Sequence, residues 1–264
     1  MKHSKLLVVT LFLLLPLLLA GRIAIYSDTQ YNDRVHSQIV QAIAEKSPDL
    51  AFLCGDLTSK GRSQEDYENW MRIAAPLLAI APVYPARGNH DKDLGLFKSY
   101  FPIVGAEAYY TVEHDSLLFV ILDSTQNMQP GSPQYLWLKT ALKTELPTLL
   151  ILHHPVFSSG MHGDELGLQL FLPALLKNSR VVAVFSGHDH HYERSLYQGI
   201  SYIVNGGAGG KLRSKKNANP YRKVFRAKHH YLIGDRMGDK LNFQVFDLKG
   251  KRIDSFSLSL KPRS

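Results

Sequence analysis

Five short motifs in this sequence contain side chains that bind metals or transfer protons. In chain order they read SDTQ, GDLT, GNHD, HHP and GHDH. Their imidazole, carboxylate and amide groups form a mixed nitrogen and oxygen donor set, which suits Fe, Mn or Zn better than Ca. One such motif alone is most often a turn or a helix cap. The full series predicts a metal site assembled from distant parts of the chain.

Apolar runs that end in polar residues predict the strands that position these motifs. The runs RIAIYSD, DLAFLCGD, TLLILHHP and VVAVFSGHDHH read as strands, and helical patterns follow at about Asp33–Lys46, Ser63–Leu78 and Glu165–Lys177. The tail alternates like strands, with turns at 237–240 and 249–251. In open α/β sheets, ligands bind where the carboxyl ends of strands converge. The side chains expected to meet there are Asp28, Asp56, Asn89, His90, His153, His188 and His190.

The N-terminal segment predicts export. Lys2 and Lys5 precede the apolar run LLVVTLFLLLPLLLA, which ends at Ala20. This arrangement is typical of a signal peptide, and the run is shorter than the ~20 residues of a spanning helix. We therefore expect a signal peptide over residues 1–20 and one domain over residues 21–264, secreted or periplasmic. The alternative is an uncleaved anchor, and membrane association is expected in that case alone.

The chain is basic, with 31 Lys and Arg against 23 Asp and Glu among its 264 residues. Much of the excess lies in residues 211–230, which contain no acid. One interpretation is a basic lip that attracts anionic substrates, lipid headgroups or nucleic-acid phosphates. The other is a solvated surface loop. No nucleic-acid-binding motif accompanies the charge, so a nucleic-acid partner is not expected.

The five motifs resemble those of the calcineurin-like metallophosphoesterase superfamily, D-x-H, GD-x-x, GNH-[DE], H and GH-x-H, in the same order. The resemblance covers nearly all of residues 22–258. GHDHHYER followed by GISYIVNGGAGG is most similar to the purple acid phosphatase-like branch. The resemblance implies an α/β fold, a four-layer α/β/β/α sandwich of two mixed sheets, with a dinuclear metal site at the C-terminal strand edge.

The resemblance also implies which residues hold the metals. Asp56 would bridge two divalent or trivalent ions (Mn, Fe or Zn), because two adjacent cations repel each other and need a shared carboxylate. The first ion would take Asp28 and His190, with Gln30 beside it. The second would take Asn89, His153 and His188; the spacing to the following proline selects His153 over His154.

Three further residues are candidates for catalysis. By resemblance, His90 would face the phosphate and assist the transition state, with Asn89 beside it, and Asp91 would orient its ring. His162 would bind substrate and protonate the leaving group. The plainer interpretations are a turn residue for Asp91 and an exposed loop histidine for His162.

The implied reaction is metal-dependent hydrolysis of phosphoesters. Two cations lower the pKa of a water and supply hydroxide near neutral pH. The purple acid phosphatase likeness favours an anionic phosphomonoester as substrate. The alternatives are a phosphodiesterase, for cyclic nucleotides or other diesters, and a non-catalytic relative that recognises phosphate.

The sequence departs from the superfamily pattern at two positions. Gln30 stands where most members have histidine, and Ser59 stands where the purple acid phosphatases supply a tyrosine, so no iron–tyrosinate colour is expected. Three roles are open for Gln30. It could bind the first metal through its amide oxygen, or it could hydrogen-bond a water bound to that metal. In the third, the first metal site is empty. We expect a working site with a loosely held first metal.

Overall fold

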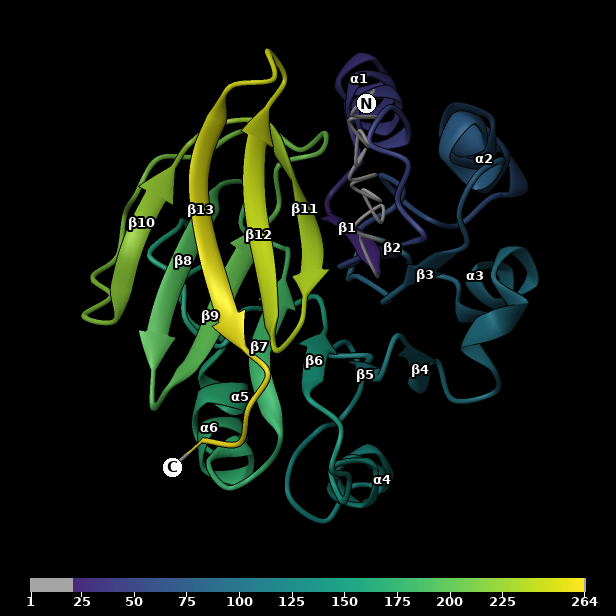
Figure 1. The fold of residues 1–264 in the computed structure, drawn as a ribbon. Coiled ribbons are helices and arrows are strands. Elements are labelled where there is room, and N and C mark those ends of the chain that lie inside the picture. Colours follow the sequence, from purple (N-terminus) through teal and green to yellow (C-terminus); the bar gives the residue numbers. More distant parts are fainter. Residues whose placement is uncertain (1–20, 264) are drawn as a thin grey trace, which may run out of the picture.

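Two mixed sheets form the centre of the molecule (Figure 1). The computed structural model describes residues 21–263; the predicted signal peptide lies outside them. In the first sheet the order is β13 (Arg252–Ser259), β12 (Lys240–Asp247), β11 (His230–Met237), β1 (Arg22–Tyr26), β2 (Leu50–Leu53) and β3 (Val83–Pro85). In the second it is β10 (Arg222–Arg226), β8 (Tyr192–Tyr197), β9 (Ile200–Asn205), β7 (Val181–Ser186), β6 (Thr148–Ile151), β5 (Leu117–Ile121) and β4 (Tyr110–His114).

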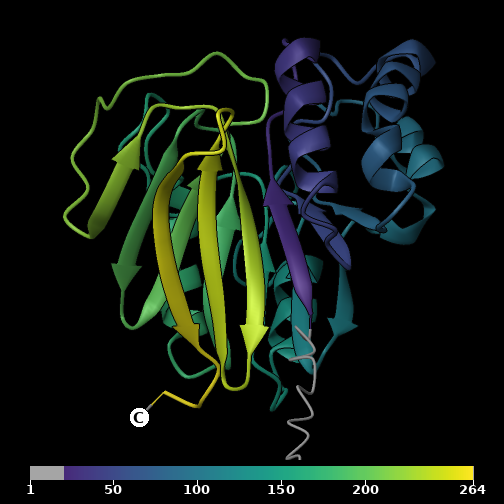
Figure 2. The same ribbon diagram turned by 45° about the horizontal axis from the view of Figure 1, so that its top comes forward.

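Helices cover part of the outer face of each sheet. The first sheet packs against α1 (Asp33–Ala44), α2 (Gln64–Leu78), α3 (Leu94–Tyr100) and the 3-10 helix η1 (Pro102–Val104). The second packs against α4 (Pro133–Ala141), α5 (Leu166–Gln169) and α6 (Leu172–Leu176). Viewed from a second direction, α1 and α2 lie beside β1, and the long strands β11, β12 and β13 continue the same sheet on the other side of β1 (Figure 2). The predicted α/β/β/α sandwich is confirmed.

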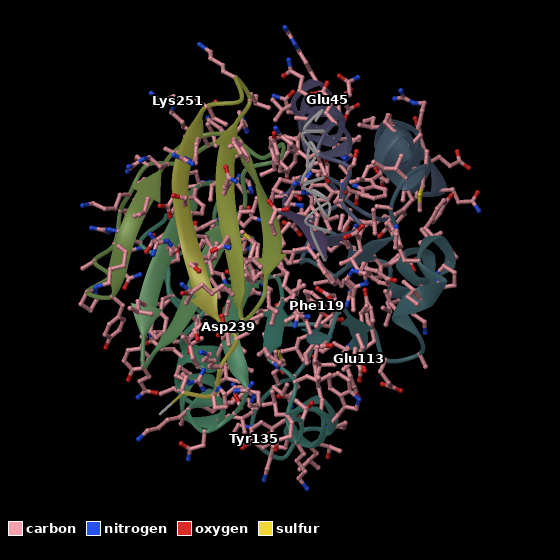
Figure 3. The ribbon with its side chains drawn as sticks, in the orientation of Figure 1. Glu45, Glu113, Phe119, Tyr135, Asp239 and Lys251 are labelled. Carbon is pink, nitrogen blue, oxygen red and sulfur yellow. The ribbon has the colours of Figure 1, made fainter. Side chains whose placement is uncertain are left out.

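The core between the sheets is rich in aromatic residues. Phe52 of β2 stacks on Phe119 of β5 with ring centroids 4.3 Å apart, and Phe185 packs against Phe243. In Figure 3, Phe119 lies inside the molecule, whereas the charged residues Glu45 and Lys251 lie at its periphery. Burial of such rings supplies much of the stability that holds the two sheets together.

Parallel pairing brings the motif-bearing loops to one edge. In the first sheet β1, β2 and β3 are parallel neighbours, and in the second β5, β6, β7 and β9 are. Their carboxyl ends therefore face the same way. SDTQ follows β1, GDLT follows β2, GNHD follows β3, HHP follows β6 and GHDH follows β7. The edge predicted from the sequence is the one observed.

Most predicted helix boundaries are confirmed, and one helix is not. Helix α2 begins with a capping box in which Ser63 Oγ accepts from Asp66 N and the Asp66 carboxylate accepts from Ser63 N. The single helix expected near Glu165–Lys177 is wrong. Its residues form the short helices α5 and α6, because the chain leaves helical geometry at Phe171 and Pro173 has no N–H to continue an α5 ladder. Among the described residues, no helix is both long and apolar enough to span a bilayer.

Candidate metal centre

Three of the predicted ligands sit on strained backbone at the strand ends. Asp28, Asp56 and His188 have φ values of 58°, 53° and 70°, a region that residues other than glycine seldom adopt. Neighbouring glycines make room for them: a Cβ on Gly88 would overlap Asp56, and one on Gly187 would overlap Asp28. Such strain clusters at functional sites, where the surrounding structure holds it in place.

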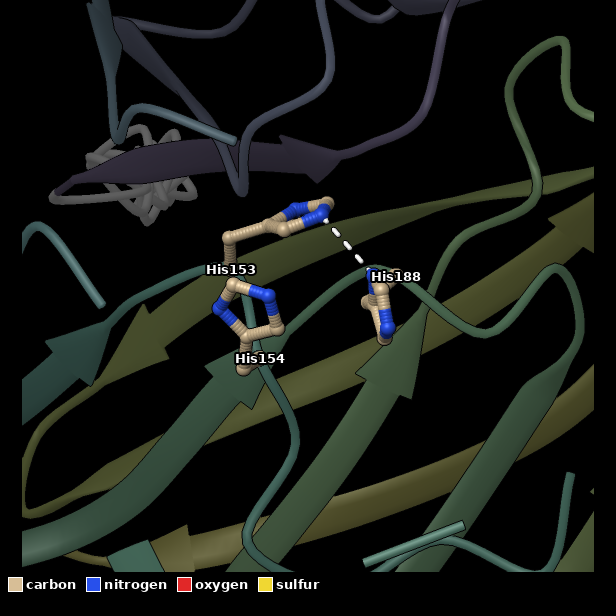
Figure 4. Close-up of side chains that lie close together, drawn as sticks. All are labelled: His153, His154 and His188. Atoms are coloured by element: carbon tan, nitrogen blue, oxygen red, sulfur yellow. Dashed lines mark hydrogen bonds between the residues drawn. The ribbon is translucent and has the colours of Figure 1, made fainter. Parts of the chain in front are cut away.

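Three predicted ligands of the second metal converge on one another. Asn89 Oδ1 lies 3.0 Å from His153 Nε2 and 2.9 Å from His188 Nδ1. Figure 4 shows His153 and His188 facing each other, and these two ring nitrogens are 3.3 Å apart. On its far side, His153 Nδ1 lies 2.9 Å from the Cys54 carbonyl. A hydrogen bond to that carbonyl fixes the ring and leaves Nε2 free as a donor to a metal.

The predicted ligands of the first metal lie beside this group. Gln30 Nε2 is 3.0 Å from Asp56 Oδ2 and 3.5 Å from His190 Nε2, and His190 Nε2 is 3.4 Å from Asp28 Oδ1. Asp56 Oδ2 is also 3.3 Å from His153 Nε2. Asp56 therefore stands between the two groups, where a bridging carboxylate is expected.

Acids and imidazoles in the site shift the pKa values of one another. Burial alone would raise the pKa of Asp56, but His153 and the His90 backbone N–H together hold it well below its usual range. Burial alone would likewise lower the pKa of His153, yet Asp56 raises it to about 9. Burial and the nearby His153 lower the pKa of His188 to about 2. Two buried acids close to several imidazoles make a site that favours cations.

His90 lies at the site, but Asp91 does not orient it. The His90 backbone N–H donates to Asp56 Oδ1 at 2.8 Å, while its ring Nδ1 lies 2.7 Å from the Ser59 carbonyl and 3.1 Å from Tyr31 Oη. The Asp91 carboxylate points the other way, fully buried, and accepts from the backbone N–H groups of residues 57, 58 and 88. The predicted role of Asp91 is therefore corrected: it ties two ligand loops together, and Ser59 and Tyr31 contact the ring.

The loop after β6 brings two further histidines to the site. The rings of His154 and His162 lie 4.6 Å and 4.4 Å from that of His188. His154 Nδ1 contacts Ser124 Oγ at 2.9 Å, and burial lowers its pKa to about 3. A neutral His154 next to His153 and His188 is a possible donor that family spacing alone did not select.

Asp189 is a residue that sequence reasoning missed. It lies between two predicted ligands in GHDH, is fully buried, and accepts from Ser158 Oγ at 2.5 Å and His162 N at 3.0 Å. These bonds fix the loop that carries His162. The signal in the sequence was the acid within GHDH, but a buried carboxylate without a metal role has no distinctive spacing.

Comparison with protein families identifies the fold and the motifs together. The family model for calcineurin-like phosphoesterases matches residues 21–192, which include all five motifs. The chain belongs to the calcineurin-like phosphoesterase family. The resemblance seen in the sequence is confirmed.

Known relatives of this calcineurin-like chain include plant phosphatases. It is 26% identical over 264 residues to a nucleotide pyrophosphatase/phosphodiesterase of Hordeum vulgare, covering 80% of this chain and 72% of that protein. It is 28% identical over 214 residues to the probable purple acid phosphatase 20 of Arabidopsis thaliana, covering 67% and 50%. The chain thus matches about half the length of the Arabidopsis protein.

A solved structure of the same fold comes from yellow lupin. Purple acid phosphatase PPD1 from Lupinus luteus seeds superposes with a TM-score of 0.78 at 18% identity, covering 91% of this chain and 54% of that one. At this identity the likeness concerns the fold. It places the two-sheet sandwich of this calcineurin-like chain among those of the purple acid phosphatases.

The side chains present fit a pair of metal ions. The donor atoms of Asp28, Asp56 and His153 all lie within 4.8 Å of one another, and those of His153, His154 and His188 form a second such group. Gln30 Oε1 is buried and has no hydrogen-bond partner among the described residues. A half-turn of its amide would exchange Oε1 with Nε2, which faces Asp56 and His190, and so offer an oxygen donor there.

Replacement of Gln30 by histidine is expected to strengthen the first metal site. Imidazole is a better donor than an amide oxygen for Fe, Mn or Zn, so the affinity should rise roughly tenfold. Metal content after dialysis at limiting metal measures this, with Gln38→His on the exposed face of α1 as control. Unchanged occupancy and turnover in Gln30→His would place Gln30 outside the metal's coordination.

Proposed function

We propose that the chain is a metal-dependent phosphoesterase that acts chiefly on phosphomonoesters. The observation that supports this most directly is the position of Asp56 between two adjacent donor groups, 3.3 Å from His153 and 3.0 Å from Gln30. When bound, two ions of Mn, Fe or Zn polarise the phosphoryl group and supply hydroxide near neutral pH. Asp28, Gln30, Asp56 and His190 hold one ion; Asn89, His153 and His188, with Asp56, hold the other.

The remaining residues act on the substrate. His90 lies beside Asp56, and its contacts with Ser59 and Tyr31 hold the ring in place, so Nε2 is positioned to stabilise charge on the phosphoryl oxygens. Asn89 precedes His90 in the chain, and its amide would also contact the phosphoryl group. His162, exposed and packed against His188, is positioned to give a proton to the departing alcohol.

The basic segment, residues 211–230, is proposed to attract the anionic substrate. Its start is fixed to the site: Lys211 O lies 3.0 Å from His190 Nδ1, Arg213 N donates to His190 O, and Lys216 N donates to Ser159 O. Figure 2 shows the loop between β9 and β10 arching beside the strand ends. Lys215 and Lys216 are exposed there, and the backbone bonds that hold the start of the segment against the site favour the basic lip over a solvated surface loop. Export of residues 21–264 after removal of the signal peptide remains our proposal for localisation.

A second candidate function is hydrolysis of phosphodiesters. It is favoured by the name of the barley relative, a nucleotide pyrophosphatase/phosphodiesterase that spans most of this chain. The test is to assay the purified chain on p-nitrophenyl phosphate and on bis-p-nitrophenyl phosphate, with Mn, Fe, Zn or no metal. Faster turnover of the monoester supports a phosphomonoesterase, and faster turnover of the diester supports the second candidate. If neither substrate is hydrolysed although two ions are bound, the chain is instead a non-catalytic relative that recognises phosphate.

Replacement of His162 by alanine is expected to slow the hydrolysis of alkyl phosphates far more than that of p-nitrophenyl phosphate. An alkoxide needs a proton as it leaves, whereas p-nitrophenolate leaves readily without one. We expect kcat for alkyl phosphates to fall about a hundredfold and that for p-nitrophenyl phosphate much less. Met161→Ala, at the exposed neighbour, is the control. An equal fall for both substrate classes would argue that His162 has a role in binding alone.

A further inference from the structure

A pocket of about 440 Å³ lies between the N-terminal ends of α1 and α2, next to the metal centre. It shares three residues with the site: Gln30, Tyr31 and Ser59 line the pocket, and each also contacts Asp56 or His90. The pocket is therefore adjacent to the place where a phosphoryl group would bind. The groups that line it indicate which part of a substrate it would take.

The pocket is acidic in an otherwise basic protein. Asp33, Glu65 and Asp66 line it, and its lining includes no lysine or arginine, although the chain carries a net charge of +8. Among the described residues, none of these three acids forms a salt bridge. The pocket is thus unsuited to a phosphate and suited to a cation.

Helix capping explains part of this acidity but not the whole pocket. Acids in the first turn of a helix interact favourably with its dipole, and Asp66 completes the capping box of α2. Capping, however, needs no cavity. It also leaves unexplained the deeper pair of side chains, His36 and Trp70, each 2% exposed, which line the same pocket with rings 5.8 Å apart.

His36 is a buried group in the deep part of this pocket that lacks a partner, as Gln30 Oε1 does at the side next to the metal centre. Its Nε2 is buried and makes no hydrogen bond with any described residue. Burial lowers the pKa of His36 to about 3, so its ring is neutral and keeps a nitrogen lone pair that can accept an N–H bond. The indole of Trp70 is held in place by a 3.0 Å bond from Nε1 to Thr29 Oγ1. A buried acceptor beside an aromatic ring suits an ammonium ion.

We propose that this acidic pocket binds an ammonium group carried by the leaving group of the substrate. The phosphoryl group would lie at the metal centre while the ammonium lies among Asp33, Glu65, His36 and Trp70. The inference rests on the proposed phosphoesterase function and narrows its substrate class to phosphorylated amino alcohols.

The kinetic test compares ω-aminoalkyl phosphates of two to six carbons with uncharged alkyl phosphates that have a methyl group in place of the ammonium. At the best length, kcat/KM should favour the amine by roughly tenfold, the size expected for partly exposed charges. The double variant Asp33→Asn/Glu65→Gln should lose most of this ratio. Glu68→Gln, an exposed acid of α2 outside the pocket, should keep it. Equal kcat/KM at every length, with p-nitrophenyl phosphate still hydrolysed, would overturn the inference and leave the proposed function intact.

A binding test works without metal or turnover. In a Trp137→Phe background, Trp70 is the one remaining tryptophan, and its fluorescence reports on the pocket. Titration with ω-amino alcohols should give a saturable change that 1-alkanols of equal length do not give. If no phosphoester is hydrolysed, this result still supports the pocket as an ammonium site, and its absence would overturn the inference independently of catalysis.

Discussion

Replacement of Asp56 by asparagine is expected to weaken metal retention and to lower turnover severely. Asp56 accepts the His90 N–H through Oδ1, and its Oδ2 lies against His153 and Gln30. Asparagine has the same shape but offers an N–H₂ group in place of one oxygen, and it removes the negative charge between two cations. We expect kcat/KM to fall on the order of a thousandfold, comparable to loss of a principal electrostatic group in other active sites.

Metal analysis separates this effect from a general loss of folding. The Asp56→Asn protein should remain folded by circular dichroism while its metal content falls toward one ion or none. Asp239→Asn is the matched control, because Asp239 is exposed and pairs with Lys261 at the opposite end of the first sheet. An Asp56→Asn protein that kept two ions and full turnover would refute the bridging role.

The convergence of the candidate metal ligands was predictable because each lies in the loop that follows a strand. Asp28 comes two residues after β1 and His188 two residues after β7, and parallel pairing carries both to one edge. The sequence pattern thus indicated both the types of the candidate ligands and the edge of the sheets where they meet. The strand and helix pattern alone predicted an α/β domain, and the four layers were expected from the resemblance to the calcineurin-like superfamily.

Residues whose role depends on contacts between loops were not predictable. Asp91 follows His90 directly, so the sequence favoured a bond between them, yet its carboxylate turns toward the GDLT loop. Asp189 supports the His162 loop from the middle of a ligand motif. The acidic pocket could not be predicted from the sequence either, because it forms only where the N-terminal ends of α1 and α2 lie side by side. In each case the partner is set by tertiary packing, which spacing along the chain does not record.

Replacement of Asp91 by alanine is expected to destabilise the protein strongly. The carboxylate is fully buried and accepts from the backbone N–H groups of Leu57, Thr58 and Gly88 at 3.2, 3.3 and 3.0 Å. Alanine would leave these donors buried without an acceptor. Because an orphaned buried donor costs roughly 1–3 kcal/mol, we expect the free energy of unfolding to fall by about 3 kcal/mol.

Denaturant unfolding in EDTA measures this loss without any contribution from bound metal. Asp93→Ala is the matched control: Asp93 is exposed, caps α3 through a single bond to Leu96 N at 2.9 Å, and should lose about 1 kcal/mol. If Asp91→Ala cost no more than Asp93→Ala and instead lowered kcat alone, the original idea of an acid that orients His90 would be restored. A large loss of stability would show instead that Asp91 holds the GDLT and GNHD loops together, so that the candidate ligands Asp56 and Asn89 reach the same site.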